Sequence, residues 1–553
     1  MENADQNESF LPDPTAIVQH KGGFKATWFY RQLLNGPVPK KPRVNAPELW
    51  PGDPLRGHEL LKGIFSFQSE RYHLTSAANV PAQASANWLS WFHSLAWLSD
   101  LKALGGTDQG VEAPYFAREW ALAWINAHTT WSYFAWDPTI TAERVMHWIL
   151  TWDFLTNNDA SGLFSKSLRK VAGRDARHVL RSKPDSELGF QALRVLKGQI
   201  FAIHGILGGE RRQQNIMVHL DQELGIQVLP DGGHIERNPE ILALVLRDLL
   251  QLRSFCAVAM GQVPACLQNA IDRSAPMLRT LRHPDGALAL FNGGQEGKAA
   301  DLDLLLGQTD PTTSSPVSAP YAGFQRLNAG STVILMDCGQ PGGPGHNHHA
   351  GTLSFELSFG RKRLIVNCGA RSGKNDPWRT ALAATAAHST LTVNDTSSAA
   401  FALDGTMRRG PVDVTCKRQD SEIGTLVETS HSGYVNTFGL THHRALFMDA
   451  TGEDIRGEDR LTGTGGEYAS IRFHLHPDVQ ASLVGNNNGV LLRFDSKSKQ
   501  VWRFKSSLGD VTLEESIYMG RVGEHRRCEQ IVVSVPLSGN GALIQWSLQQ
   551  SSV

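Results

Sequence analysis

The histidines of one short segment are the residues of this chain whose types and spacing best suit chemistry. His346, His348 and His349 lie just before a stretch, 351–359, in which apolar and polar residues alternate. The alternation predicts a β-strand with one buried face. A strand is rigid, so imidazoles at its mouth can be held in fixed directions for metal binding or proton transfer. The segment therefore predicts a metal centre or a catalytic centre.

A second polar cluster precedes a predicted helix start. His234, Glu236 and Arg237 are followed by Asn238 and Pro239, a capping residue and a proline at the first helical position. The N-terminus of a helix favours an anion, and an arginine can hold a carboxylate with two hydrogen bonds. His234 is a candidate proton donor or acceptor, with a loop imidazole that has no task as the alternative. Glu236 either serves this site or simply caps the helix or pairs with a cation.

Length and composition set the frame for these clusters. The chain has 553 residues, which predicts two or three domains, and 53 basic against 54 acidic residues. A formal net charge of −1 excludes a general attraction to nucleic acid or anionic membranes. The six cysteines show no CxxC spacing, which argues against a disulfide scaffold. Residues 1–10 have no basic or apolar segment typical of an export signal, and no apolar run reaches the roughly 18–20 residues that span a bilayer. As written, the sequence predicts a soluble cytoplasmic protein.

The spacing of apolar residues differs between the two halves of the chain. Eleven of the 14 tryptophans lie before residue 153, and apolar residues recur there at helical spacing. Further helices are predicted over 193–207, 216–224, 239–260 and 263–281. From Phe324 onward, short alternating segments rich in Val, Ile and Phe predict an all-β sandwich. Tryptophans at helical spacing are more often core than ligand platform. We nevertheless expect Trp131, Trp136 and Trp148 to include residues that stack on sugar rings.

Helices followed by strands, together with four local motifs, resemble the heparinase II/III-like family of polysaccharide lyases. The motifs are residues 229–239, 345–369, 378–393 and 431–444. The resemblance implies an α+β multidomain chain, with an (α/α) toroid followed by a C-terminal antiparallel β-sandwich. We expect an N-terminal extension, partly disordered, over 1–60, the toroid over 61–290, a linker over 291–320 and the sandwich over 321–553.

The resemblance also implies β-elimination on a polysaccharide or oligosaccharide that contains uronic acid. In this reaction one group neutralises the carboxylate, a base removes the neighbouring proton and an acid protonates the leaving oxygen. The expected catalytic residues are His234, Arg237, His348 and Tyr434. The expected substrate-binding residues are Trp131, Trp136, Arg144, Trp148, Glu236 and Arg371. Relatives carry a histidine at the place of Asn347 and a tyrosine near that of Ile241, so this chain departs from the pattern.

A structural zinc ion is the one cofactor that the resemblance implies, and no redox or nucleotide cofactor is expected. The family's ligand positions fall on His349, Asn367 and His388, where relatives carry an aspartate in place of Asn367. An amide oxygen is a poorer zinc ligand than a carboxylate. The alternative for His388 is an imidazole that is hydrogen-bonded inside the sandwich.

Two other functions stay open. One is a glycoside hydrolase on the same toroid, which needs two carboxylates roughly 5–10 Å apart. Its candidates are Asp137, Asp153, Asp231 and Glu236. The other is a non-catalytic family member that binds an anionic glycan. The family generally works in the cell envelope or periplasm, which makes that compartment the alternative to the cytoplasm. The sequence does not specify an oligomeric state.

Overall fold

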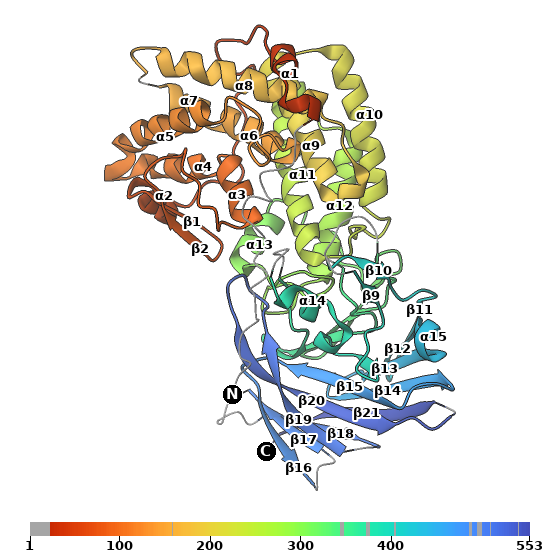
Figure 1. Ribbon diagram of the computed structural model, residues 1–553. Coiled ribbons are helices and arrows are strands. Elements are labelled where there is room, and N and C mark those ends of the chain that lie inside the picture. Colours follow the sequence, from red (N-terminus) through yellow and green to blue (C-terminus); the bar gives the residue numbers. More distant parts are fainter. Residues whose placement is uncertain are drawn as a thin grey trace, which may run out of the picture. The chain divides into compact units, whose positions relative to one another are not determined.

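The fold class predicted from the sequence is confirmed: helices come first and antiparallel sheets follow (Figure 1). The structure is a computed structural model that describes residues 23–157, 159–342, 348–371, 376–402, 405–485, 489–494, 500–508, 510–539 and 541–552. Of the predicted histidine motif, His346 and Asn347 lie outside these residues.

The helices follow the apolar periodicity of the sequence. They are α1 (Trp28–Leu33), α2 (Pro54–Leu61), α3 (Ala86–His93), α4 (Trp97–Lys102), α5 (Ala113–Ala127), α6 (Pro138–Leu150), α7 (Trp152–Thr156), α8 (Leu163–Arg181), α9 (Phe190–Phe201), α10 (Glu210–Gln227), α11 (Pro239–Met260), α12 (Ala265–Thr280), α13 (Ala299–Leu306), α14 (Trp378–Ala383) and α15 (Val435–Phe438). The helix predicted over 239–260 has these same bounds in α11. No helix of the described residues combines the length and the apolar content needed to cross a membrane.

Two antiparallel sheets form the second half of the fold, preceded by a small hairpin of β1 (Ile64–Phe67) and β2 (Glu70–His73). The remaining strands are β3 (Ser318–Ala319), β4 (Phe324–Ala329), β5 (Thr332–Asp337), β6 (Phe355–Phe359), β7 (Lys362–Val366), β8 (Leu391–Val393), β9 (Ala400–Phe401), β10 (Met407–Arg409), β11 (Thr415–Ser421), β12 (Gly424–Tyr434), β13 (Leu440–Asp449), β14 (Asp454–Gly463), β15 (Tyr468–Leu475), β16 (Gln480–Val484), β17 (Gly489–Arg493), β18 (Gln500–Ser506), β19 (Asp510–Tyr518), β20 (Arg526–Pro536) and β21 (Ala542–Ser552).

Each of the two sheets contributes one face to a shared core. One sheet runs β11-β12-β13-β14-β21-β18-β17-β16 and the other β19-β20-β15-β7-β6-β5-β4-β3, with β8 beside β15. Along β13, buried residues alternate regularly with half-buried ones, the period of two that a one-faced strand requires. Buried side chains of both sheets, among them Phe355, Phe473 and Trp546, form one apolar cluster. This is the core of the sandwich.

The described chain divides into two compact units. The first contains residues up to 184 together with 194–217 and 254–261, and the second contains 185–193, 218–253 and 262–553. Helices α9, α10 and α11 each contribute residues to both units. The second unit therefore holds the sandwich together with α12 and the 229–239 loop.

Two segments differ locally from the sequence expectation. The strand expected over 351–359 begins only at Phe355, because Leu353 has a φ of 67° and the preceding residues form a turn. In this turn the Leu353 N–H donates to the Asp337 carbonyl and the Ser354 N–H to the Gly351 carbonyl. The segment expected as a linker over 291–320 contains α13 and β3.

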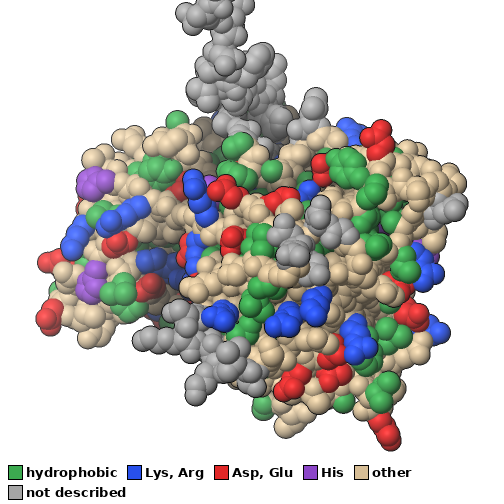
Figure 2. Space-filling view, turned by 90° about the horizontal axis from the view of Figure 1, so that it is seen from below, with side chains coloured by type: hydrophobic (Ala, Val, Ile, Leu, Met, Phe, Trp, Pro, Cys, Tyr) green, Lys and Arg blue, Asp and Glu red, His purple; other side chains and the backbone are tan. Residues whose placement is uncertain are grey.

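Charged side chains of both signs occur together on the face of the protein shown in Figure 2. On the face shown in Figure 2, the basic and acidic side chains of the described residues are interspersed. The view is consistent with the formal net charge of −1.

Candidate functional site

The conformation of the 229–239 loop, in the second unit, is fixed largely by its backbone. Gly232 has a φ of 87°, and a Cβ atom there would lie 2.0 Å from the Arg273 carbonyl oxygen, so only glycine fits. The Leu229 N–H donates to the Gly233 carbonyl, which closes the turn. Asn238 then caps α11 as predicted, accepting from the Glu240 and Ile241 N–H groups at 2.8 and 3.2 Å. The loop is thus a defined platform at a helix start.

Arg237 lies inside this platform. Its guanidinium donates to the carbonyls of Ala322 and Gln340 at 2.7 and 3.0 Å and pairs with the Asp337 carboxylate. The side chain is only 7% exposed. The sequence predicted a group that grips a substrate carboxylate, whereas the structure gives Arg237 a carboxylate of the protein itself.

Asp337, at the end of β5, is the centre that sequence reasoning missed. Besides Arg237, it accepts from the Asn292 side-chain amide at 3.1 Å and from the Gly339 N–H at 3.1 Å. Asn292 also donates to the Arg237 carbonyl at 3.1 Å and has a φ of 49°. Asp337 and Asn292 are far from the loop in sequence, and neither carries a local motif. Only the pairing of distant segments brings them to it.

His234 is a buried, neutral imidazole. Its Nε2 lies 3.1 Å from the Gln227 side-chain oxygen, and its Nδ1 accepts from the Glu236 N–H at 3.2 Å, which places the proton on Nε2. Burial lowers the pKa of His234 to about 3. The sequence predicted a proton donor or acceptor here, or a loop imidazole with no task.

Glu236 is the loop residue whose protonation can change near neutral pH. Burial raises its pKa to about 7, against a weaker opposing effect of the Phe190 N–H, which donates to the carboxylate at 3.0 Å. Its side chain is 11% exposed, so it retains some access to solvent. A carboxyl group with these properties can accept or release a proton at neutral pH.

His349 and His388 come together as the resemblance implied. Nδ1 of His349 lies 3.2 Å from Nε2 of His388, and the other ring nitrogen of His388 lies 2.8 Å from the Ala384 carbonyl. Burial lowers the pKa of both imidazoles, that of His388 to about 4. Asn367 is occupied elsewhere: its side chain accepts from the Ser389 N–H and donates to the Leu290 carbonyl.

These contacts decide how well the described residues fit a zinc ion. A structural zinc takes four ligands. Among the described residues, no group of three histidine, cysteine, aspartate or glutamate side chains is arranged to hold a metal. Two imidazoles and an amide engaged with the backbone do not make up that set, so the zinc ion stays a prediction.

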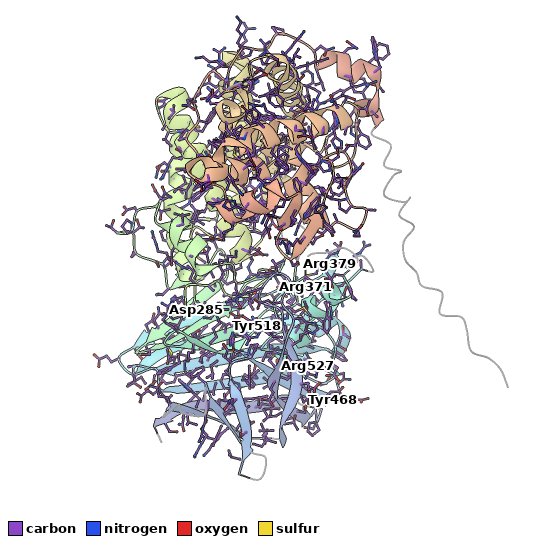
Figure 3. The ribbon with its side chains drawn as sticks, turned by 90° about the vertical axis from the view of Figure 1, so that its left-hand side faces the viewer. Asp285, Arg371, Arg379, Tyr468, Tyr518 and Arg527 are labelled. Atoms are coloured by element: carbon purple, nitrogen blue, oxygen red, sulfur yellow. The ribbon has the colours of Figure 1, made fainter. Side chains whose placement is uncertain are left out.

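The other predicted residues of the second unit are spread apart. Tyr434 is fully buried in the sandwich core, where its hydroxyl donates to the Leu391 carbonyl at 2.8 Å. Burial raises the pKa of Tyr434 well above its usual range. Arg371 is half-buried and donates to the Glu524 carbonyl at 2.8 Å (Figure 3). His348 is half-buried beside His349.

The predicted sugar-stacking group lies in the first unit, and most of it is core. Trp136, Arg144 and Trp148 are 3%, 1% and 0% exposed. Arg144 and the Trp148 indole both donate to the Asp175 carboxylate, at 2.8 and 3.1 Å. Trp131 is half-buried, so of this group it has the most open side chain. Arg144 and Trp148 thus differ from the exposed cleft residues expected from the sequence, because surrounding helices cover them.

A second buried network joins the segment after α12 to β6 and β7. The His283 imidazole lies 2.8 Å from a Glu356 oxygen and 2.6 Å from the Ser358 hydroxyl, and the side chains of His283 and Glu356 are fully buried. Glu356 also accepts from the Asn367 N–H at 2.9 Å. Nearby, Arg363 pairs with Asp285 at 2.9 Å and donates to the Tyr518 hydroxyl at 3.3 Å. Figure 3 labels Asp285 and Tyr518. Sequence reasoning had no signal for these pairs.

Comparisons with known proteins bear on both halves of the chain. Residues 311–547 match the sequence profile described as "Heparinase II/III-like, C-terminal". FtsZ-localized protein C of Caulobacter vibrioides is 28% identical over 561 residues, which cover 96% of this chain and 94% of that protein.

Solved structures share the fold at low identity. A heparinase III structure superposes with a TM-score of 0.75 at 12% identity, covering 98% of this chain and 94% of that chain. A heparan sulfate lyase HepC mutant from Pedobacter heparinus gives 0.66 at 15% identity, covering 95% and 88%. The chondroitin AC lyase of Streptomyces coelicolor A3, in complex with chondroitin sulphate, gives 0.52 at 11% identity, covering 98% and 82%. The predicted toroid-plus-sandwich fold is therefore confirmed.

Proposed function

Because the chain belongs to the heparinase II/III-like family, we propose that it is a polysaccharide lyase acting on a uronic-acid-containing polysaccharide or oligosaccharide. The fold, shared along nearly the whole chain with a heparinase III, supports this class of reaction. One observation supports a particular residue in this reaction: the Glu236 carboxyl group, just before α11, has a pKa of about 7. The other predicted catalytic residues of this loop, His234 and Arg237, are buried and hydrogen-bonded within the protein.

The proposed reaction is a β-elimination. A base removes the C5 proton alpha to the uronate carboxylate, the C4–oxygen bond breaks, and the departing oxygen takes up a proton. A double bond forms between C4 and C5, with no net oxidation or reduction. We assign Glu236 to one of the two proton transfers, because a carboxyl with a pKa of about 7 matches the pH at which it would work.

An ultraviolet assay tests this proposal directly. Purified protein is incubated with heparan sulfate, chondroitin sulfate, alginate and polygalacturonate, and the absorbance of the new conjugated double bond is followed. At least one polymer should give a steady rise. Glu236→Gln should lower kcat by about 10²–10⁴-fold, the usual range for a proton-transfer residue. Glu187→Gln, an exposed glutamate with the same change of charge, is the matched control and should keep full activity.

A second candidate function has its own supporting observation. Three of the four predicted catalytic side chains, those of His234, Arg237 and Tyr434, are buried and hydrogen-bonded within the protein. This favours a family member that binds an acidic glycan without cleaving it. Binding of a polymer by calorimetry, with no rise in absorbance and no new reducing ends, would support this candidate against the lyase. New reducing ends without absorbance would instead indicate a hydrolase, and neither binding nor cleavage would reject all three.

The relative from Caulobacter vibrioides bears on location. Its name describes a protein localised with FtsZ. We extend this to the present chain as part of the proposal: it works at the site of cell division. A fluorescent fusion should concentrate at midcell in dividing cells, and an even distribution throughout the cell cycle would contradict this extension.

A further inference from the structure

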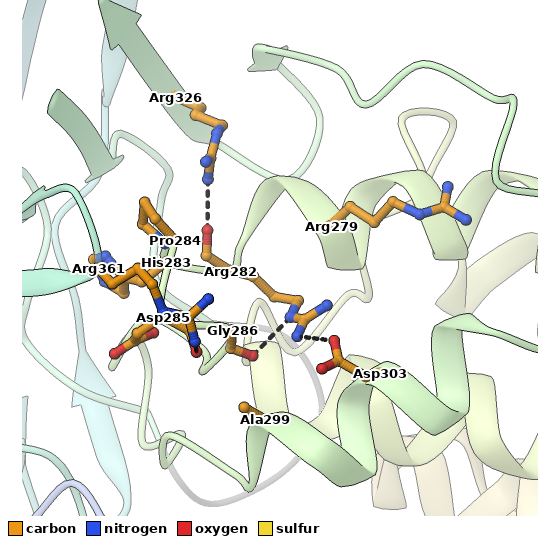
Figure 4. A pocket seen from close by; sticks show the side chains of 10 residues that line it. All are labelled: Arg279, Arg282, His283, Pro284, Asp285, Gly286, Ala299, Asp303, Arg326 and Arg361. Atoms are coloured by element: carbon orange, nitrogen blue, oxygen red, sulfur yellow. Dashed lines mark hydrogen bonds and ion pairs between the residues drawn. The ribbon is translucent and has the colours of Figure 1, made fainter. Parts of the chain in front are cut away.

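A pocket lined by arginines lies in the second unit, apart from the 229–239 loop. Its volume is about 340 Å³, and Figure 4 shows its lining. The walls come from the end of α12, the turn after it, α13, β4 and the turn between β6 and β7. Four arginines line it against two aspartates: Arg279, Arg282, Arg326, Arg361, Asp285 and Asp303.

Both aspartates are already paired, so they do not neutralise the whole pocket. Asp303 pairs with Arg282 at 2.6 Å, as the dashed line in Figure 4 shows. Asp285 pairs at 2.9 Å with Arg363, a buried arginine that does not line the pocket. Burial would raise the pKa of Asp285, but the positive charge of Arg363 outweighs it and lowers the pKa. Asp285 therefore stays ionised and its charge is balanced by Arg363. Of the four pocket arginines, only Arg282 pairs with a carboxylate among the described residues. Arg279, Arg326 and Arg361 have no such partner there.

Arg326 is held rigidly and still has a donor to offer. Its Nη1 donates to the Thr280 and Arg282 carbonyls at 2.8 and 2.6 Å, and its Nε donates to the Asn328 side chain at 2.9 Å. These bonds fix the plane of the guanidinium. Within the described part of the chain, Nη2 has no hydrogen-bond partner. Burial lowers the pKa of Arg326 to about 10, which reflects a cation that the protein does not compensate.

Arg361 and Arg282 complete the cationic wall. Arg361 is exposed, and among the described residues its Nη2 donates to the Asp285 carbonyl at 3.3 Å. Arg282 is fixed by Asp303 and by the Gly286 carbonyl at 2.7 Å. Arg279 is less involved, because it donates to the Thr309 hydroxyl and the Asp310 carbonyl at 2.8 and 2.7 Å, and in Figure 4 its guanidinium points away from Arg361.

We propose that this pocket binds the phosphate or sulfate group of a small ligand, with Arg326 and Arg361 as the anion-binding residues. Planar guanidinium groups match the oxygen geometry of tetrahedral oxyanions, and a half-buried site strengthens each such bond. The volume is at the lower end of the range for small-molecule sites and suits a single phosphorylated or sulfated sugar unit. The inference does not rest on the proposed lyase activity.

Calorimetry with inorganic anions tests the site. The full-length protein is titrated with sodium phosphate and with sodium sulfate at constant ionic strength, with sodium chloride as the reference. One equivalent of phosphate or sulfate should bind with a Kd below 1 mM. Arg361→Gln should weaken binding at least tenfold. The matched control is Arg503→Gln, which removes the same charge from an exposed arginine on β18 and should leave the Kd unchanged.

A second titration shows whether the site prefers a phosphate or a sulfate group. Glucose 6-phosphate and glucose 6-sulfate are compared, and tighter binding of one identifies the group that the site prefers. Arg326→Lys keeps the charge but loses the planar fork, so it should also weaken binding. If Arg326→Lys fails to fold, Arg361→Glu decides, since reversal of this exposed charge should abolish binding. No binding of any of the four anions, or equal losses in Arg361→Gln and Arg503→Gln, would overturn the proposal.

Discussion

The helical unit and the sandwich each enclose a buried arginine–aspartate pair, and the two pairs are built in similar ways. Arg144 and Asp175 are joined at 2.8 Å in the first unit, and Arg444 and Asp459 at 2.8 Å in the second. In each case a tryptophan indole donates to the aspartate, Trp148 at 3.1 Å and Trp546 at 2.9 Å. Each guanidinium also lies over an aromatic ring and donates to backbone carbonyls.

The pairs differ in what they hold. Arg144 binds the carbonyls of His93, the last residue of α3, and of Ala135, in the turn before α6, so all three lie within the first unit. Arg444 binds the carbonyls of Leu353 and Ser389, the segments that carry His349 and His388. A buried ion pair can thus be internal packing in one region and the support of a candidate site in another.

The largest effect is expected from Asp459→Ala. The change leaves Arg444 charged and fully buried and removes the partner of His442, which lies 2.8 Å from Asp459. Breaking such a pair by removing one partner should lower the free energy of unfolding by about 4–5 kcal/mol. Urea denaturation measures the loss. Hydrogen exchange should also increase around residues 353 and 389, and unchanged exchange there would contradict the supporting role.

Asp175→Ala should have a smaller effect, about 3 kcal/mol. Asp175 has a second partner, Arg174, which is 17% exposed and can turn to water when the carboxylate is lost. Burial alone would raise the pKa of Asp175, but the two arginines outweigh it and hold the pKa at about 2. The ionised carboxylate therefore stabilises the fold above about pH 4, and this contribution is lost as pH falls towards 2. Exchange around residues 353 and 389 should stay as in the wild type. An increase there would remove the distinction between the two pairs.

Glu236→Gln should change stability in a pH-dependent way. Burial raises the pKa of Glu236 from 4.5 to about 7, so the folded protein binds more protons than the unfolded chain between these values. The wild type therefore loses stability as pH rises from about 4.5 to 7. At pH 8 the glutamine variant should be more stable by about 1–3 kcal/mol, and at pH 4 the two should be equal. Thermal unfolding at both pH values measures the difference, and an equal gain at both would contradict it.

The smallest effect is expected from an exposed pair. Arg418 and Asp420 are 2.9 Å apart, but the aspartate side chain is 59% exposed. Asp420→Ala should lower the free energy of unfolding by less than about 1 kcal/mol. The variant is also the control for Asp459→Ala, because both remove one aspartate from the same sheet. A loss as large as that of Asp459→Ala would mean that burial does not decide the comparison.

The periodic and capping signals of the sequence were sufficient for the elements. Asn238 and Pro239 marked the start of α11, and regular alternation marked the sandwich strands. Long strands and helices have a repeating burial pattern, which survives whatever they pack against. The start of the strand after the histidine motif was harder to predict, because residues 351–354 form a turn that no local pattern encodes. In it the Leu353 N–H donates to the Asp337 carbonyl and the Ser354 N–H to the Gly351 carbonyl.

The role of each charged residue was the part that the sequence left open. Arg144 and Arg237 have the chemistry of anion-binding residues, yet each pairs with a carboxylate from elsewhere in the chain, Arg144 with Asp175 and Arg237 with Asp337. Arg326 and Arg361, which no motif marked, are left with no such partner in the described residues. Local residue types determined the elements and which groups could titrate or bind. Only the tertiary structure decided which charges are neutralised inside the protein, because burial and pairing depend on segments that are distant in the sequence.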